Sequence, residues 1–277
     1  MSAVRIARGR ARPDERDCFG ELGEGMGRTI RILADRTALA DALAGAVTRV
    51  AAESVALRGR FAVALPGGSA LDLLAEGEDR LTAAGGLRPD GTQWEVFWVD
   101  ERFVPSDHPE RNDRTAREGL LRRIGVPDGR IHPMDPLESP ESTAAAYASR
   151  LADFLSPSPG APPRFDLVLL GVGEDGHVAS LFPGHPALGE TRSWVVAVTG
   201  APKPPPVRTS LSLPVLNAAR QVFLAVSGPG KAPVLARILG PSPGAPTLPA
   251  ARIRPDPGHA AWFLDRDAAR RMEENPA

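Results

Sequence analysis

Residues 165–177 read FDLVLLGVGEDGH and carry the clearest indication of the fold. Residues 165–170 are apolar apart from Asp166, which indicates a short buried strand, and the glycines that follow predict a tight loop at its carboxyl end. Other short apolar runs alternate with helical patterns along the rest of the chain. Such alternation is typical of a parallel sheet covered by helices on both faces.

The alternation extends to both sides of this stretch. Further strands are expected at residues 61–65, 94–99, 194–198, 222–226 and 261–264, and helices at 37–58, 112–124, 142–155, 231–239 and after 265. Proline-rich stretches at 156–163, 202–206 and 241–249 fall inside this pattern, so we expect them to be surface loops rather than domain boundaries. The sequence predicts a single doubly wound α/β domain with a mostly parallel sheet.

Length and composition exclude several classes of protein. A chain of 277 residues can bury a sizeable core, and its only cysteine, Cys18, excludes an intramolecular disulfide or a cysteine-based zinc site. With 34 acidic and 33 basic residues the net charge is −1, which argues against nucleic acid or an anionic membrane as a partner. The sequence contains no apolar run long enough to span a membrane and no secretory signal, so a cytoplasmic setting is expected.

The limits of the domain are also expected from sequence. Residues 1–28 are predicted to be a disordered extension, 29–270 the folded domain and 271–277 a C-terminal tail. A strand-like stretch begins at Thr29, shortly after Met26, so the sequence leaves open whether translation starts at Met1 or at Met26.

The loop at 171–177 matches the G-x-G-x-x-G pattern of dinucleotide sites, but its chemistry does not fit one. Glu174 and Asp175 would place two carboxylates where a pyrophosphate binds, and Pro183 stops the following helix too early for a βαβ crossover. What remains is His177, two residues after Asp175 at the end of a strand. His177 can act as a general base near neutral pH, and Asp175 can orient its ring.

Two glycine-containing turns at strand ends are suited to anion binding. In the first turn, Gly67, Gly68 and Ser69 precede a helix and can offer backbone N–H groups, although an ordinary tight turn is an equally good interpretation. In the second, a Gly-Pro-Gly turn places Lys231 at a helix start. It is not a Walker P-loop, because Ala232 follows the lysine where Ser or Thr is required.

Two arginines are further candidate ligands for an anion. Arg102 follows Asp100 and Glu101 at the end of a strand, where it could hold a phosphate or carboxylate or simply pair with a neighbouring acid. Arg208 follows the proline-rich stretch that begins at Lys203 and could add a second cation. For Lys203 itself, a solvated loop charge is the simpler interpretation. These two lysines, 203 and 231, are the only ones in the chain.

Two kinds of catalytic site are not supported. The chain has no G-x-S-x-G motif for a serine nucleophile. Its five histidines show no spacing typical of metal ligands, so no metal is expected.

Taken together and in this order, these loops resemble the 6-phosphogluconolactonase family. The strongest match is the stretch from Phe165 to Pro186, and it is supported by residues 99–102, 203–209, 213–219, 228–231 and 262–265. The resemblance covers about residues 29–270. In the first glycine loop, Ala70 and Leu71 stand where the family usually has Thr-Pro, which puts a hydroxyl contribution from that loop in doubt.

The resemblance implies a Rossmann-like α/β/α sandwich that hydrolyses 6-phospho-D-glucono-1,5-lactone to 6-phospho-D-gluconate, the second step of the oxidative pentose phosphate pathway. No metal or cofactor is implied, and the partner would be the small sugar-phosphate lactone. His177 would deprotonate water and Asp175 would orient it, while Lys231, Arg208 and the amides of residues 67–69 would hold the phosphate. Arg102 would contact either the phosphate or the carbonyl side. The oligomeric state, monomer or small homo-oligomer, stays open.

Two other functions remain as alternatives. An aldose–ketose isomerase or deaminase of amino-sugar phosphates has a similar Asp-Gly-His turn, but typically continues with Asn-Glu-Pro and has Tyr where Arg102 stands. This chain has Ser180-Leu181-Phe182-Pro183 instead, without a carboxylate. A non-catalytic sugar-phosphate sensor on the same fold would need a DNA-binding module, and residues 1–28 are too short and too mixed in charge for one.

Overall fold

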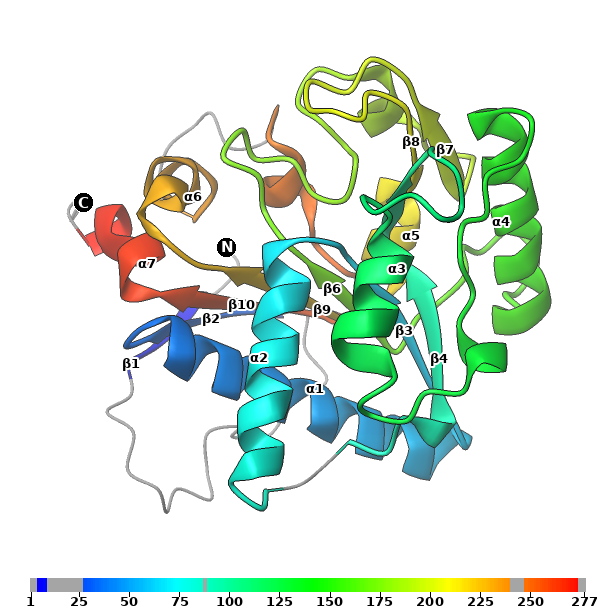
Figure 1. Ribbon diagram of the computed structural model, residues 1–277. Coiled ribbons are helices and arrows are strands. Elements are labelled where there is room, and N and C mark those ends of the chain that lie inside the picture. Colours follow the sequence, from blue (N-terminus) through cyan, green and yellow to red (C-terminus); the bar gives the residue numbers. More distant parts are fainter. Residues whose placement is uncertain (1–3, 9–26, 87–88, 240–246, 274–277) are drawn as a thin grey trace.

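A parallel sheet forms the centre of the computed structural model, which describes residues 4–8, 27–86, 89–239 and 247–273 (Figure 1). Its strands are β1 (Val4–Arg8), β2 (Gly27–Leu33), β3 (Phe61–Leu65), β4 (Trp94–Trp98), β6 (Leu167–Leu170), β9 (Gln221–Val226) and β10 (His259–Asp265). They lie in the order β1-β2-β10-β9-β6-β3-β4, and every pair is parallel. The α/β architecture expected from the alternating pattern is confirmed.

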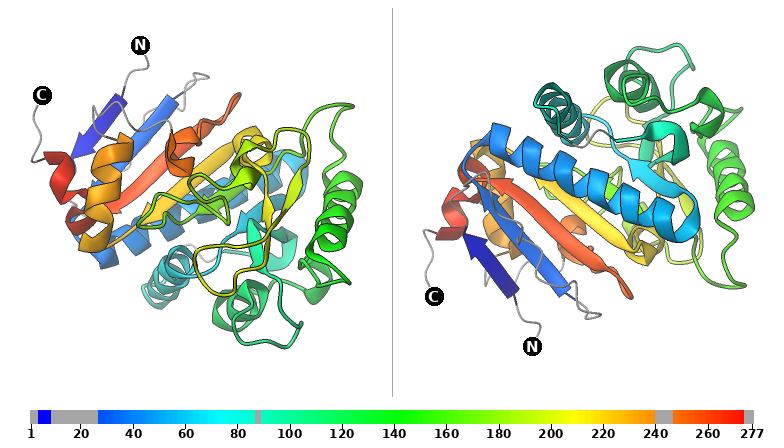
Figure 2. Two further views of the ribbon diagram at one scale, coloured as in Figure 1. Left: turned by 90° about the horizontal axis from the view of Figure 1, so that it is seen from above. Right: turned by 90° about the horizontal axis from the view of Figure 1, so that it is seen from below.

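Helices cover both faces of the sheet. They are α1 (Arg36–Arg58), α2 (Ser69–Ala83), α3 (Asn112–Ala116), α4 (Pro140–Leu155), α5 (Leu213–Ala218), α6 (Ala232–Leu239) and α7 (Arg266–Glu273). Seen from below, α1 crosses the near face and α6 lies on the far side (Figure 2). Gly59 ends α1 with φ of 71°, as its position predicts.

Three short strands form a second, antiparallel sheet. β5 (Asp100–Arg102), β8 (Arg208–Leu211) and β7 (Val195–Val198) lie in the order β5-β8-β7. The strand expected at 194–198 therefore belongs here and not to the parallel sheet. β5 and β8 were not predicted, because a strand of three or four residues that contains charged side chains has no apolar run to reveal it.

The domain boundaries differ from those expected. β1 lies within the segment expected to be disordered, and β2 begins at Gly27, so that expectation is wrong for residues 4–8 and 27–28. β1 pairs with the edge of β2, and its Val4 and Ile6 are β-branched residues that favour strands. α7 continues to Glu273, so the expected tail at 271–277 begins inside a helix. Residues 9–26 and 274–277 lie outside the described part.

Two further helices are present as expected but begin or end at other residues than the sequence predicts. The helix expected at 112–124 is α3 followed by a π-helical turn at Arg117–Leu121. α4 starts earlier than expected, at Pro140, where Ser139 and Ser142 form a capping box. No helix in the described residues is long and apolar enough to cross a membrane.

The strand order indicates where on the sheet a ligand is expected to bind. β3 lies between β4, which follows it in the chain, and β6, which comes after β4. The chain therefore runs from β3 outward to β4 and then back past β3 to β6, so the strand order reverses between β3 and β6. In open α/β sheets ligands bind at such a reversal, outside the carboxyl ends of the strands.

A buried carboxyl group lies between α1 and α2. Glu78 is 2% exposed and accepts a hydrogen bond from Thr48 Oγ1 at 3.0 Å, while its second oxygen has no partner in the described residues. The helices approach closely, since a Cβ on Gly77 would lie 2.1 Å from the Ala40 carbonyl oxygen. Burial raises the pKa of Glu78 to about 7.

The raised pKa of Glu78 predicts that the protein loses stability as the pH rises. Between the unfolded value of 4.5 and about 7, the folded state holds a proton that the unfolded state has released. The free energy of unfolding should therefore fall between pH 5 and pH 8 by about 2 kcal/mol more in the wild type than in Glu78→Gln. Urea denaturation at the two pH values measures this. Glu76→Gln is the control, because Glu76 lies on the same helix as Glu78 but is half-exposed and paired with Arg36 of α1. This variant should behave like wild type. Equal pH dependence in wild type and Glu78→Gln would contradict the prediction.

Candidate active site

A pocket of about 270 Å³ lies over the carboxyl ends of β3 and β6. All of the predicted site residues except Asp175 line it, and Asp175 is bonded to His177, which does. The loops come from far apart in the sequence: residues 66–69 follow β3, 171–177 follow β6, and Lys231 follows β9. The parallel sheet thus brings the separate motifs into one place.

His177 and Asp175 form a hydrogen-bonded pair at the pocket wall. Nδ1 of His177 lies 2.5 Å from Oδ1 of Asp175, and the His177 ring packs against Phe182 with centroids 4.7 Å apart. An Nδ1–H donated to the carboxylate leaves the lone pair on Nε2. Nε2 has no hydrogen-bond partner among the described residues, so it is available to a ligand in the pocket.

The charge state of the pair suits a base. Burial lowers the pKa of His177, and the Lys203 ammonium lowers it further, while the Asp175 carboxylate opposes both effects. Burial alone would raise the pKa of Asp175, but His177 and the hydrogen bonds from it make the net shift downward. A neutral imidazole beside an ionised carboxylate is the combination that can accept a proton from water at neutral pH.

Gly173 of the 171–177 loop makes room for this pair. A Cβ on Gly173 would lie 2.0 Å from His177 Nδ1 and 2.4 Å from Asp175 Oδ1, so no other residue fits there. Gly176 has φ of 88°, which turns the chain between the two side chains. Gly173 and Gly176 of the dinucleotide-like pattern therefore have another role here, since Gly173 accommodates the His177–Asp175 pair and Gly176 allows the turn between them.

The first glycine loop presents free backbone amides to the pocket. Gly68 has φ of 63° and precedes α2, and the N–H groups of Gly67, Gly68 and Ser69 have no acceptor in the described part of the chain. Gly67 is also required sterically, because a Cβ there would lie 1.9 Å from Asn112 Oδ1. Free amides at a helix N-terminus form a suitable cradle for an anion.

Both lysines of the chain line the pocket. Lys231 lies on the single 3₁₀ turn η5 (Pro229–Lys231), and Lys203 on the proline-rich loop before β8. Neither ammonium forms an ion pair within the described residues. Burial lowers the pKa of Lys231, as does Lys203, while Glu174 opposes the shift. The sequence favours a solvated charge for Lys203, and Lys203 is exposed while it also lines the pocket that contains His177.

The two predicted arginines are neighbours across β5 and β8. Arg102 pairs with Arg208 in the antiparallel register. Arg208 is largely engaged by its own loop: its Nε donates to Pro205 O at 3.1 Å, and its Nη2 donates to the carbonyl oxygens of Lys203 and Pro204. Arg102 donates from Nη1 to Glu110 O, and its Nε has no partner among the residues described. Arg102 therefore retains more free donors than Arg208.

Acidic and amide side chains that were not predicted as site residues hold this region together. Glu101 is 1% exposed and accepts backbone N–H groups from Arg102, Asn112 and Asp113 at 2.8 to 3.0 Å. Asn112, which lines the pocket, donates to the Asp100 carbonyl oxygen. The sequence signals for this region are the cluster of charges at 100–102, directly after an apolar strand, and Asn112 downstream of it, which also matches the family resemblance.

Asp100 is also buried, and it lines the pocket. Its Oδ2 accepts from Ser180 Oγ at 2.5 Å and lies 4.0 Å from Arg208 Nη1. Ala179, next to Ser180, has φ of 49°, an uncommon conformation for a residue with a side chain, and lines the pocket. These contacts connect the 171–181 segment to β5 and β8.

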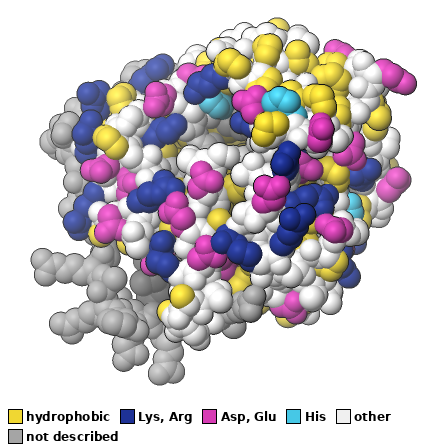
Figure 3. Space-filling view, viewed as in Figure 1, with side chains coloured by type: hydrophobic (Ala, Val, Ile, Leu, Met, Phe, Trp, Pro, Cys, Tyr) yellow, Lys and Arg dark blue, Asp and Glu magenta, His cyan; other side chains and the backbone are white. Residues whose placement is uncertain are grey.

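The pocket combines cationic side chains with free backbone amides that are suited to bind an anion. On the face shown in Figure 3, basic and acidic side chains are interspersed rather than gathered by sign. Within the described ranges, no cluster of three or more His, Cys, Asp or Glu residues could hold a metal ion. The arrangement combines an imidazole base with cations and free amides, which together suit an anionic substrate attacked by water.

Comparisons with known proteins find similar sequences and structures. The sequence profile of a family described as glucosamine-6-phosphate isomerases/6-phosphogluconolactonase matches residues 34–262. A 6-phosphogluconolactonase of Rattus norvegicus is 44% identical over 77% of this chain and 81% of its own length, and one of Homo sapiens is 42% identical over 87% and 92%. The structure of 6-phosphogluconolactonase from Trypanosoma brucei superposes with a TM-score of 0.76 at 29% identity, covering 90% of this chain and all of that one.

Proposed function

Because the chain belongs to the family of glucosamine-6-phosphate isomerases and 6-phosphogluconolactonases, we propose that it hydrolyses 6-phospho-D-glucono-1,5-lactone to 6-phospho-D-gluconate in the oxidative pentose phosphate pathway. The observation that carries the proposal is the His177–Asp175 pair facing a pocket that also holds two unpaired ammonium groups. The pair supplies a base for water, and the cations supply a site for a phosphate.

The pair accounts for both proton transfers of the reaction. Nε2 of His177 takes a proton from a water molecule as its oxygen bonds to the lactone carbonyl carbon. The bond from that carbon to the ring oxygen then breaks, and the imidazolium returns the proton to the departing oxygen. Asp175 stabilises the imidazolium between the two transfers and holds the ring through Nδ1.

The phosphate would be held at the opposite end of the substrate. The amides of Gly67, Gly68 and Ser69 and the ammonium of Lys231 are free to bind its oxygens. Arg208 retains little donor capacity, so it supports the Lys203 loop in addition to any contact with the ligand. Arg102 lies beside Arg208, which favours the phosphate side for it as well. Anchoring a remote group in this way positions the carbonyl against the base.

The isomerase or deaminase alternative is less well supported. Where the sequence pattern of those enzymes supplies a carboxylate for ring opening, this chain has Phe182, which is 2% exposed and packs on the His177 ring. The wall beside the base is therefore apolar. A purely binding function is disfavoured by the intact pair, whose Nε2 has no structural partner in the part of the chain described.

A direct assay tests the proposal. Glucose-6-phosphate dehydrogenase generates the lactone in situ, and its decay is followed after correction for spontaneous hydrolysis. The wild-type protein is expected to accelerate decay in proportion to its concentration, and to release no ammonia from glucosamine 6-phosphate. Decay at the buffer rate would contradict the proposal, and ammonia release without lactone hydrolysis would favour the deaminase.

A further inference from the structure

One edge of the small antiparallel sheet is left without a partner. β7 is the outer strand, paired only with β8. Ser212 N donates to Trp194 O at 2.9 Å, and these two residues lie opposite each other when the β7–β8 register is extended by one step. In an antiparallel ladder the bonding alternates, so Trp194, Val196 and Val198 face β8. The backbone N–H and C=O groups of Val195 and Ala197 therefore point to the open edge, and no described residue bonds them.

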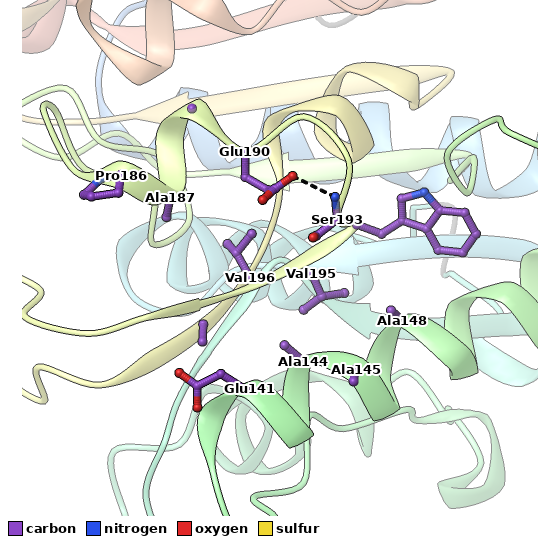
Figure 4. Close-up of a pocket in the computed structure, with 13 residues that line it drawn as sticks. Glu141, Ala144, Ala145, Ala148, Pro186, Ala187, Glu190, Ser193, Val195 and Val196 are labelled. Carbon is purple, nitrogen blue, oxygen red and sulfur yellow. Dashed lines mark hydrogen bonds between the residues drawn. The ribbon is translucent and has the colours of Figure 1, made fainter.

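This edge lies in a groove. A cavity of about 790 Å³ is lined by Val195, Val196 and Ala197, by the turn at Pro186–Gly189 on one side and by α4 on the other. Figure 4 shows the α4 side chains Ala144, Ala145 and Ala148 beside the strand. These small side chains leave space for another backbone close to β7. A strand next to a helix, with free backbone groups between them, is the geometry by which some domains add an extended peptide to a sheet.

The rim of the groove carries negative charge. Glu141, in the first turn of α4, and Glu190 lie at opposite margins (Figure 4). Glu190 accepts the N–H groups of Arg192 and Ser193, whereas Glu141 makes no ion pair within the described residues. The complementary occupant is apolar at alternate positions, to face the alanines and valines, and basic where it passes Glu141.

The recessed position of the strand favours a peptide over a second copy of the chain. The four residues of β7 span about 13 Å at roughly 3.3 Å per residue, a length that a short extended segment can match. A β7 strand from another copy would bring its own α4 and its own 186–190 turn, and both would meet the same walls. An isolated segment meets neither obstacle.

We propose that the free edge of β7 and the alanine face of α4 form a docking groove for an extended segment of another protein, with apolar residues at alternate positions and a basic residue opposite Glu141. The segment adds antiparallel or parallel to β7 through the backbone groups of Val195 and Ala197. This surface shares no residue with the pocket that contains His177.

The probe is a fluorescein-labelled heptapeptide in which valine and threonine alternate between two terminal lysines. Fluorescence polarisation measures its binding to the full chain, and amide hydrogen exchange shows which backbone groups it protects. Binding is expected to saturate below about 1 mM and to protect the amides of Val195 and Ala197. Ala145→Arg should weaken binding at least 10-fold. Ala146→Arg is the matched control, because Ala146 is exposed on the same helix but does not line the groove.

Further measurements test the charge contact with Glu141 and distinguish a peptide from a second copy of the chain as the occupant of the groove. Glu141→Gln should weaken the lysine-flanked peptide several-fold at low salt but leave a serine-flanked version unchanged. No protection of Val195 and Ala197, or equal effects of the two arginine variants, would overturn the proposal. So would concentration-dependent dimerisation of the chain alone that Ala145→Arg abolishes, because a second copy would then be the occupant.

Discussion

Replacing His177 by asparagine is expected to lower kcat for the phosphorylated lactone by about 10³-fold, the scale of a general base in proton transfer. The asparagine amide can still donate to Asp175, so the loop should keep its shape, but no basic lone pair would face the pocket. The change should leave KM nearly unchanged, because His177 is not among the groups expected to hold the phosphate. Initial rates over a substrate series, with spontaneous hydrolysis subtracted, measure both quantities.

The control for this variant is another half-buried histidine. His259 bonds Thr29 Oγ1 at the amino ends of the strands, and its replacement by glutamine should leave kcat unchanged. A kcat for His177→Asn within a few-fold of wild type would show that water is activated elsewhere, even if the protein proves to be a lactonase.

The dependence of the wild-type rate on pH provides a second readout for the same residue. Burial and Lys203 lower the pKa of His177, so the proportion of neutral base should already be high at pH 6.5. Enzymatic kcat/KM should therefore rise with pH in acid, with its midpoint at a lower pH than for an ordinary histidine. Asp175→Asn removes the charge that opposes the shift, which should move the rise to still lower pH while reducing the plateau.

The sequence predicted the parallel sheet well because its strands are nearly continuous apolar runs. β3 matches its expected limits at Phe61–Leu65, and Gly59 ends α1 as expected. The pairing of β5 with β8 was missed because it joins residues about 100 positions apart, as between Glu101 and Thr209. Nothing local in Asp100-Glu101-Arg102 indicates a strand, since its stability comes from pairing and from buried hydrogen bonds rather than from an apolar pattern.

The same distinction applies to the site. Residues with unusual chemistry at strand ends, such as His177 and Lys231, were identified because parallel strands place their carboxyl ends together. Asn112 and Gly173 were not predicted as site residues. Their contributions to the site are steric and depend on neighbours distant in sequence or on side-chain rotamers. Arg208 was identified, but its extensive bonding to the Lys203 loop could not be predicted, since no pattern shows which carbonyl oxygens a guanidinium will meet.

Replacing Lys231 by methionine is expected to lower kcat/KM for the phosphorylated lactone by about 100-fold, the loss that follows from about 3 kcal/mol for a charge-assisted bond to a phosphate. Methionine keeps most of the side-chain volume, so the turn at Pro229–Lys231 should be preserved. The unphosphorylated gluconolactone should lose less than 3-fold, because it carries no group for the ammonium to bind. Parallel kinetics on the two lactones measure the difference.

The comparison between substrates separates a phosphate ligand from a general electrostatic effect on the base. Lys203 lowers the pKa of both Lys231 and His177, so an effect of the Lys231 variant on phosphate binding must be distinguished from an electrostatic effect on the base. A field effect would change both lactones alike and would move the pH dependence of both. Arg237→Ala, an exposed cation on α6, controls for net charge and should alter neither substrate. Inorganic phosphate should inhibit the wild type competitively and Lys231→Met at least 10-fold more weakly. Equal losses on the two lactones would remove Lys231 from the phosphate site and leave the free amides of residues 67–69 and Arg102 as its remaining ligands.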